Sequence, residues 1–204
     1  SGFVEPLLDK KIFNHISTFK KSLPKVRVEV VTNGDPLNLN RLKKLFDCGL
    51  DKILISAYDG YEDVIKFQKL VDECGLNEAQ YIIRDRSLPE EKDFGITLSN
   101  RSGMMENAEF KIPNLKNPLN NPCYIPSYTL FFDYLGDVLM CPHDWGKKII
   151  LGNLKKENLL DIWFSDRSMK IRKSLVNSNR KFEPCNVCDV EGTFMGEKNS
   201  SYFN

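Results

Sequence analysis

Four of the six cysteines are the residues best suited to chemistry. Cys185 and Cys188 form a Cys-x-x-Cys pair, whose two thiolates can bind one ion from a tight turn without strain. Cys123 and Cys141 lie upstream, in the same half of the chain. Four thiolates suit tetrahedral zinc or an iron–sulfur cluster, and their number does not separate the two. In the alternative interpretation, Cys123 and Cys141 are buried apolar residues and the pair acts alone.

Composition and cysteine usage limit the class of protein. With 204 residues, 41% of them hydrophobic and 28% charged, the chain has the composition of an ordinary globular protein. Its formal net charge is +1, which leaves no basic surplus for nucleic acid, and we expect no such partner. It has no apolar run of membrane-spanning length and no signal-peptide pattern. Clustered cysteines without a secretion signal predict the cytoplasm, a reducing compartment, and metal rather than disulfides.

The first hundred residues repeat a strand-and-helix unit that must position any site in this half. Three β-branched runs predict strands at 26–31, 52–57 and 79–84, with starts 26 and 27 residues apart. Apolar residues at helical spacing lie before or between them: Ile12, Ile16, Phe19 and Leu23; Leu42, Leu45 and Phe46; Val64, Phe67, Val71 and Cys74. Two of these predicted helices close with Cys-Gly-Leu, at 48–50 and 74–76, where a glycine can end a helix. Repeated units predict parallel strands, in a barrel, part of a barrel or an open sheet, with ligands at the carboxyl ends.

Polar residues follow each predicted strand at those carboxyl ends. They include Asn33, Ser56 and Arg84. Turn chemistry and a solvated strand end explain the same residues equally well. Asp59, Asp85 and Asp144 are candidate general bases by position alone, and the sequence identifies no catalytic residue.

The second half of the chain has a different character. The stretch from Asn100 to Pro126 is rich in Asn, Pro and Lys, which predicts a linker and a domain boundary. Apolar runs at 129–134 and 138–140 then flank a Gly-Asp turn and predict a β-hairpin that brings Cys123 and Cys141 toward one end. A short apolar piece at 149–154 follows, then one helix near Leu159 and a second one capped by Ser165. His143 is expected beside the ligands or on the surface rather than as a ligand.

The cysteine pattern resembles a known family. Twelve residues separate Cys123 from Gly136, four separate Gly136 from Cys141, and Cys-x-x-Cys follows after a long gap. The pattern over residues 123–189 resembles the SPASM domain, or its shortened twitch form, of radical S-adenosylmethionine (SAM) enzymes. The sequence segments at 136–141, 151–154 and 160–163 are also similar to those of that domain. The first half resembles the radical SAM barrel from its second strand onward. The expected fold class is α/β: a partial (β/α) barrel at 1–100, incomplete at the N-terminus, a linker at 101–122, and a small β-hairpin-and-helix SPASM/twitch domain at 123–204.

The resemblance implies roles for individual residues. Residues 1–8 are similar to the family's Gly-Gly-Glu-Pro loop, which implies that Glu5 helps to hold the SAM amino group. Asn33 falls near SAM, Ser56 near the ribose and Arg84 near the carboxylate. The metal ligands implied are the four cysteines, Cys123, Cys141, Cys185 and Cys188. They would bind one auxiliary 4Fe–4S cluster that accepts or relays the electron of a substrate radical.

The sequence also departs from the family. The Cys-x-x-x-Cys-x-x-Cys motif that ligates the SAM-cleaving cluster is absent, which predicts an N-terminally truncated chain that is inactive alone. The full-length protein is expected to bind SAM, a second 4Fe–4S cluster, a reductant such as flavodoxin or ferredoxin, and a small-molecule or peptide substrate. It would be an oxidoreductase or an enzyme that modifies peptides, sugars or metabolites. Two other hypotheses remain: a zinc-stabilised, non-catalytic binding module, and a degenerate radical SAM scaffold.

Overall fold

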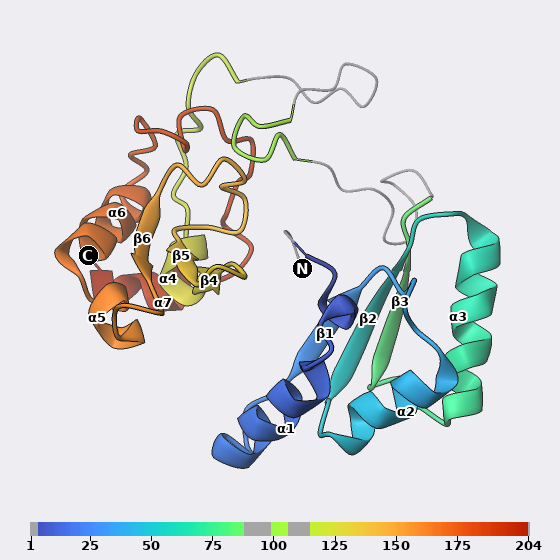
Figure 1. Cartoon of the computed structure of the whole chain (residues 1–204). Coiled ribbons are helices and arrows are strands. Elements are labelled where there is room, and N and C mark those ends of the chain that lie inside the picture. Colours follow the sequence, from blue (N-terminus) through green and yellow to red (C-terminus); the bar gives the residue numbers. More distant parts are fainter. Residues whose placement is uncertain (1–3, 88–98, 106–114, 204) are drawn as a thin grey trace. The chain divides into compact units, whose positions relative to one another are not determined.

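The structure is a computed structural model that describes residues 4–87, 99–105 and 115–203 (Figure 1). The chain divides into two units, Ser1–Thr97 and Leu98–Asn204. The predicted segments 1–100, 101–122 and 123–204 stay a prediction, and each of them includes residues outside the described ones. The first unit contains, in order, η1 (Pro6–Leu8), α1 (Ile12–Ser22), β1 (Glu29–Thr32), α2 (Leu39–Asp47), β2 (Lys52–Ala57), α3 (Tyr61–Cys74) and β3 (Tyr81–Asp85).

The three strands of the first unit form a parallel sheet in the order β1-β2-β3, as their spacing predicted (Figure 1). Two predicted boundaries were wrong. The first strand begins at Glu29 rather than at residue 26, and the third spans 81–85 rather than 79–84. Glu29 pairs with Lys52, the first residue of β2, and just before it the Val28 carbonyl accepts from the N–H groups of Asp51 and Lys52. Closure of the sheet into part of a barrel stays a prediction.

The helices of the first unit bury different amounts of apolar surface. Four side chains on α2 and α3 are completely buried: Leu42, Leu45, Phe67 and Val71. On α1 only Ile16 is buried, while Phe19 is 44% exposed and Leu23 is 48% exposed. The predicted stripe was therefore wrong at its C-terminal end, because the helix stops at Ser22 and Leu23 takes a non-helical conformation.

Both Cys-Gly-Leu sequences end a helix, as predicted. Gly49 and Gly75 take positive φ angles of 101° and 76°, a region that favours glycine. Cys48 and Cys74 are half-buried and pack against the core of this unit. Their position agrees with the prediction that these two cysteines are packing residues.

A carboxylate ties α1 to the start of the sheet. Asp51 accepts a hydrogen bond of 2.7 Å from the Val28 backbone N–H and one of 2.9 Å from Lys20 Nζ. These hydrogen bonds, the backbone one foremost, hold the pKa of Asp51 below its usual value. The stability of this unit therefore depends in part on the ionised form of one surface carboxyl.

The second unit is built on a small antiparallel sheet, β4-β5-β6. Its elements are α4 (Ile125–Tyr128), β4 (Phe131–Phe132), β5 (Asp137–Leu139), β6 (Ile150–Asn153), α5 (Leu159–Trp163), α6 (Asp166–Val176), α7 (Glu197–Ser200) and η2 (Ser201–Phe203). The predicted hairpin is confirmed, with shorter arms, because Asp133 turns the chain: its carboxylate accepts the N–H groups of Leu135 and Asp137 and pairs with Lys147. Ser165 caps α6, as predicted, by accepting from the N–H of Ser168.

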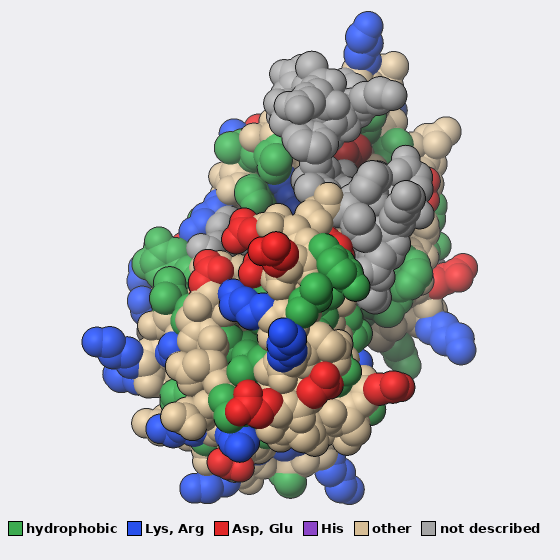
Figure 2. Space-filling model, turned by 90° about the vertical axis from the view of Figure 1, so that its right-hand side faces the viewer, with side chains coloured by type: hydrophobic (Ala, Val, Ile, Leu, Met, Phe, Trp, Pro, Cys, Tyr) green, Lys and Arg blue, Asp and Glu red, His purple; other side chains and the backbone are tan. Residues whose placement is uncertain are grey.

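Charges are mixed on the surface of the described residues. On the face shown in Figure 2, acidic and basic side chains are interspersed, in keeping with the formal net charge of +1. None of the helices that the structure describes combines the length and the apolar character that a membrane crossing requires.

Candidate functional site

The four cysteines singled out as metal ligands line one cavity in the second unit. Three separate segments supply them: the residues before α4, the residue pair after β5, and the loop after α6. All four are free thiols, and each is 7–9% exposed. The remaining lining is largely apolar and includes Met140, Leu175 and Val190.

Burial controls the protonation of these thiols. It raises the pKa of Cys123, raises that of Cys185 to about 12, and raises that of Cys141 well above its usual value. The three thiols therefore stay protonated at neutral pH until positive charge replaces the proton, as a soft metal centre does. Within the described part of the chain, no three His, Cys, Asp or Glu side chains are gathered closely enough to hold a single ion as they stand. The four sulfurs share a cavity without closing on one point.

Backbone hydrogen bonds hold the segment that contains Cys123 against the end of α6 and against the residues that follow the Cys-x-x-Cys pair. The N–H of Cys123 donates to the carbonyl of Leu175 at the end of α6, at 3.0 Å, and the N–H of Tyr124 donates to the carbonyl of Gly192, at 2.8 Å. Gly192 has a φ of 72°, and a Cβ placed on it would overlap Sγ of Cys123. Sequence reasoning missed Gly192, because the only signal was a glycine four residues after the Cys-x-x-Cys pair.

The loop after β5 presents Cys141 to the cavity. The N–H of His143 donates to Sγ of Cys141 at 3.4 Å, and the carboxylate of Asp144 accepts from the N–H groups of Lys148 and Ile149. His143 itself lines the cavity, and burial lowers its pKa, so the ring is neutral at pH 7. It therefore lies beside the thiols, one of the two positions expected for it. Asp144 is 1% exposed and anchors this loop rather than facing solvent as a base.

Asn100 ties a distant turn to the Cys-x-x-Cys loop. Its side chain is completely buried, its amide donates to the carbonyl of Val187, and its Oδ1 accepts from the N–H of Asp189 at 3.4 Å. Its own backbone N–H donates to Asp189 Oδ2 at 2.8 Å. Sequence reasoning missed this residue, because it lies at the start of the stretch interpreted as a linker.

The residues expected near SAM gather at the carboxyl ends of the strands of the first unit. Glu5 accepts hydrogen bonds from Thr32 Oγ1 at 2.7 Å, from the N–H of Asn33 at 2.9 Å and from the N–H of Leu7 at 2.9 Å. The Asn33 side chain donates to the carboxylate of Asp35 and accepts from its N–H, contacts that agree with the turn interpretation. Residues 1–3 of the Gly-Gly-Glu-Pro-like stretch lie outside the described residues.

Ser56 and Arg84 lie opposite each other in the register of β2 and β3. Ser56 is 4% exposed. Burial lowers the pKa of Arg84, and its buried Nε has no hydrogen-bond partner among the described residues. An unpaired guanidinium N–H at the carboxyl edge of a parallel sheet suits an anionic ligand.

The other two candidate bases differ in their surroundings. The carboxylate of Asp85 is buried and accepts from both the N–H and the Oγ of Ser87. Asp59 is exposed, one residue before α3's glycine cap. Neither residue has an observed contact that marks it as a base.

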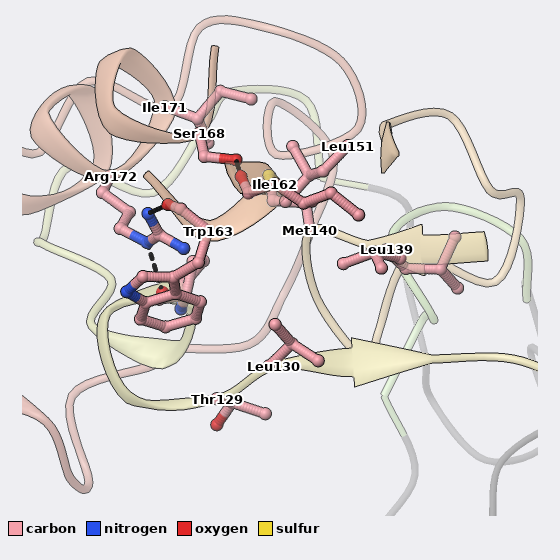
Figure 3. A pocket seen from close by; sticks show the side chains of 12 residues that line it. Thr129, Leu130, Leu139, Met140, Leu151, Ile162, Trp163, Ser168, Ile171 and Arg172 are labelled. Carbon is pink, nitrogen blue, oxygen red and sulfur yellow. Dashed lines mark hydrogen bonds between the residues drawn. The ribbon is translucent and has the colours of Figure 1, made fainter. Parts of the chain in front are cut away.

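A second cavity lies between the small sheet and α5 and α6 (Figure 3). Its lining is apolar apart from Thr129, Ser168 and Arg172. The guanidinium of Arg172 stacks on the Trp163 ring, 3.6 Å from the ring centre, and donates to the carbonyls of Pro126 and Trp163. Trp163 therefore belongs to this packing arrangement.

Comparison with known proteins identifies the family of this chain. Residues 123–189 match the SPASM family model, described as an iron–sulfur cluster-binding domain. The chain is 30% identical over 187 residues to the S-adenosyl-L-methionine-dependent 2-deoxy-scyllo-inosamine dehydrogenase of Niallia circulans. That match covers 91% of this chain and 69% of the dehydrogenase.

Solved structures agree with the sequence match. The crystal structure of BtrN in complex with AdoMet and 2-DOIA superposes with a TM-score of 0.74 at 29% identity, covering 91% of this chain and 69% of BtrN. A selenomethionine BtrN crystal structure in an open conformation gives a TM-score of 0.62 at 22% identity, covering 95% and 74%, and supports the fold alone. The predicted resemblance is thus confirmed: the chain belongs to the radical SAM family and carries a SPASM iron–sulfur domain.

Proposed function

We propose that Cys123, Cys141, Cys185 and Cys188 bind one auxiliary 4Fe–4S cluster that takes up an electron during a radical SAM dehydrogenation. The observation that carries the proposal is the convergence of four buried free thiols, from three segments, on one cavity inside the iron–sulfur domain match. Four cysteine ligands leave no iron of such a cluster open, which favours electron transfer over substrate binding.

The proposed reaction follows from the chemistry of a secondary alcohol. Oxidation to a ketone removes two hydrogens, one as an atom and one as a proton, and leaves one electron to be accepted. When bound and cleaved with one electron from an external reductant, SAM would supply the radical that removes the hydrogen atom, and the auxiliary cluster would supply an acceptor for the electron that the substrate releases. The Niallia relative is a dehydrogenase of 2-deoxy-scyllo-inosamine by name. We therefore take the substrate class to be a small amino-polyol.

The chain's own residues bind and orient the partners in this scheme. The buried Nε–H of Arg84, which has no partner among the described residues, is available to the SAM carboxylate, and Ser56 on the neighbouring strand offers a hydroxyl to the ribose. Glu5 holds the end of β1 through Thr32 and Asn33, which leaves its oxygens engaged. We propose that Glu5 positions the SAM amino group through this backbone rather than by a free carboxylate.

Metal analysis separates this proposal from zinc binding. Protein purified without oxygen should contain about four irons and four acid-labile sulfides per chain and be brown. Cys185→Ser with Cys188→Ser should lose both iron and sulfide. The matched control is Cys48→Ser with Cys74→Ser, two half-buried cysteines outside the cavity, which should keep both. One zinc without sulfide would refute the electron-transfer role and favour the non-catalytic module.

A degenerate scaffold is the other alternative, and SAM binding tests it. Calorimetric titration with SAM should show binding by the wild-type chain that Arg84→Met weakens. A chain that holds the cluster but does not bind SAM would favour a scaffold in which the first unit has lost its ligand.

A further inference from the structure

Arg180 is a buried cation beside the four-thiol cavity. It is 2% exposed and is among the largest fully buried side chains of the described residues. Its guanidinium donates to the carbonyls of Asn121 at 3.0 Å, Pro122 at 2.9 Å and Val190 at 2.7 Å, and also to the carbonyl of Glu191. Every acceptor is a neutral backbone oxygen.

This arrangement satisfies the hydrogen bonds of Arg180 but not its charge. Among the described residues, no carboxylate lies within ion-pair distance of Arg180. Charged side chains are almost never fully buried unless a charge of opposite sign accompanies them, because desolvation of a lone ion is expensive. Arg180 is therefore a buried cation that has no direct ion pair with a carboxylate among the described residues.

The position of Arg180 indicates where the counterion belongs. Arg180 lines the same cavity as the four cysteines. Its acceptors are the two residues directly before Cys123 and the second and third residues after Cys188, so the guanidinium joins the first and last ligand segments. The amide of Asn121 adds a hydrogen bond of 3.0 Å to the carbonyl of Glu191 between the same segments.

We propose that Arg180 is the countercharge of the iron–sulfur cluster and favours its reduced state, a proposal that rests on the proposed function of the four cysteines. Four thiolates carry more negative charge than a cubane core neutralises, and reduction adds one further electron. A fixed cation in a dry, low-dielectric site stabilises the more negative state more strongly. Charge and hydrogen bonding around a cluster are among the features that set its reduction potential. Arg180 is thus a positioning and tuning residue.

Arg172 provides a matched control within the same unit. It is also 2% exposed, and it also donates to backbone carbonyls, but it lines the second cavity and stacks on Trp163 (Figure 3). Loss of either guanidinium should destabilise the unit, because buried carbonyl groups then lose their donors. Only the loss of Arg180 should alter the cluster's electron affinity.

The test is a redox titration of the holoprotein, followed by its spectrum, on wild type, Arg180→Gln, Arg180→Lys and Arg172→Gln. Arg180→Gln should favour the oxidised cluster at least tenfold more than wild type, which lowers the one-electron potential by about 59 mV or more. Arg180→Lys keeps the charge and should lie closer to wild type than Arg180→Gln. Arg172→Gln should unfold more easily without a comparable change in potential.

The other possible results of this titration also support or overturn the proposal for Arg180. An Arg180→Gln protein that is loaded and has the wild-type potential overturns the proposal, as does an equal shift in Arg172→Gln. If Arg180→Gln folds by circular dichroism but does not retain iron, retention by Arg172→Gln supports the proposal and equal loss overturns it. If wild type itself contains no iron and sulfide, the proposed function fails first, a result distinct from a loaded cluster that ignores Arg180.

Discussion

Gly192→Ala tests whether close backbone approach builds the four-thiol cavity. The new Cβ would overlap Sγ of Cys123, and alanine would have to adopt a φ of 72°. A left-handed conformation costs a residue with a Cβ about 1–2 kcal/mol, and overpacking a buried site costs about 1–3 kcal/mol. We therefore expect the free energy of unfolding of the second unit to fall by about 2–5 kcal/mol.

The control is Gly136→Ala in the same unit. Gly136 has a similar φ of 86°, but the nearest atom to its Cβ position is Asn153 Oδ1 at 3.5 Å, an ordinary contact. The free energy of unfolding of this variant should therefore fall only by the conformational cost, about 1–2 kcal/mol. The difference between the two variants isolates the contact with Cys123.

Urea unfolding of the metal-free protein, followed by tryptophan fluorescence, measures both variants. The chain has two tryptophans, Trp145 and Trp163, and both lie in the second unit, so the signal reports that unit alone. Iron and sulfide per chain give the second readout: Gly192→Ala should bind less than wild type, and Gly136→Ala should bind as much. Equal unfolding midpoints and equal iron content in the two variants would refute the reasoning.

Three other predictions follow from single contacts. Asn100→Ala removes the side-chain hydrogen bonds to Val187 and Asp189 and should lower the free energy of unfolding by about 2–4 kcal/mol. The same urea titration measures this change, and a decrease smaller than that of a surface variant would contradict the prediction. Arg84→Met should weaken SAM binding roughly tenfold or more, because hydrogen bonds to charged groups contribute about 1.5–3 kcal/mol, while Arg27→Met, at a surface ion pair, should bind SAM as wild type does in calorimetry. The pKa of Asp51 is depressed in the folded state, so its stabilisation is complete above the ordinary value of 3.8 and is lost as pH falls below it. Asp51→Asn should thus flatten the acid limb of the first unit's unfolding curve, followed by circular dichroism, and an unchanged slope would count against this carboxyl.

The sequence predicted the features whose signal is local. Runs of β-branched residues indicated the strands and period-3.6 patterns indicated most of the helices, since a few neighbouring residues decide whether a segment is buried or has a buried face. Both Cys-Gly-Leu helix ends and the hairpin turn were recognised because their residues prefer those backbone angles. The Cys-x-x-Cys pair was recognisable because a short chelate needs only a tight turn, and the spacing of Cys123, Gly136 and Cys141 before it carried much of the family resemblance.

Contacts between distant segments were decided only by the tertiary structure. Arg180 bonds backbone carbonyls 58 and 59 residues away, and Asn100 bonds residues 87 and 89 positions away. Such partners are carbonyl and amide groups that every residue possesses, so no residue type in the sequence marks them. The strand limits had the same origin, because Glu29 begins β1 only where β2 begins beside it.

The sequence by itself thus determined which residues supply the chemistry, because thiols and Cys-x-x-Cys spacing are properties of the chain. The tertiary structure decided how those thiols are held and charged: Gly192 lets one segment approach Cys123, Asn100 fixes the Cys-x-x-Cys loop, and Arg180 places a cation beside the cavity. The physical reason is that burial and desolvation act through space. The charge environment of a site therefore exists only after segments far apart in sequence have packed together.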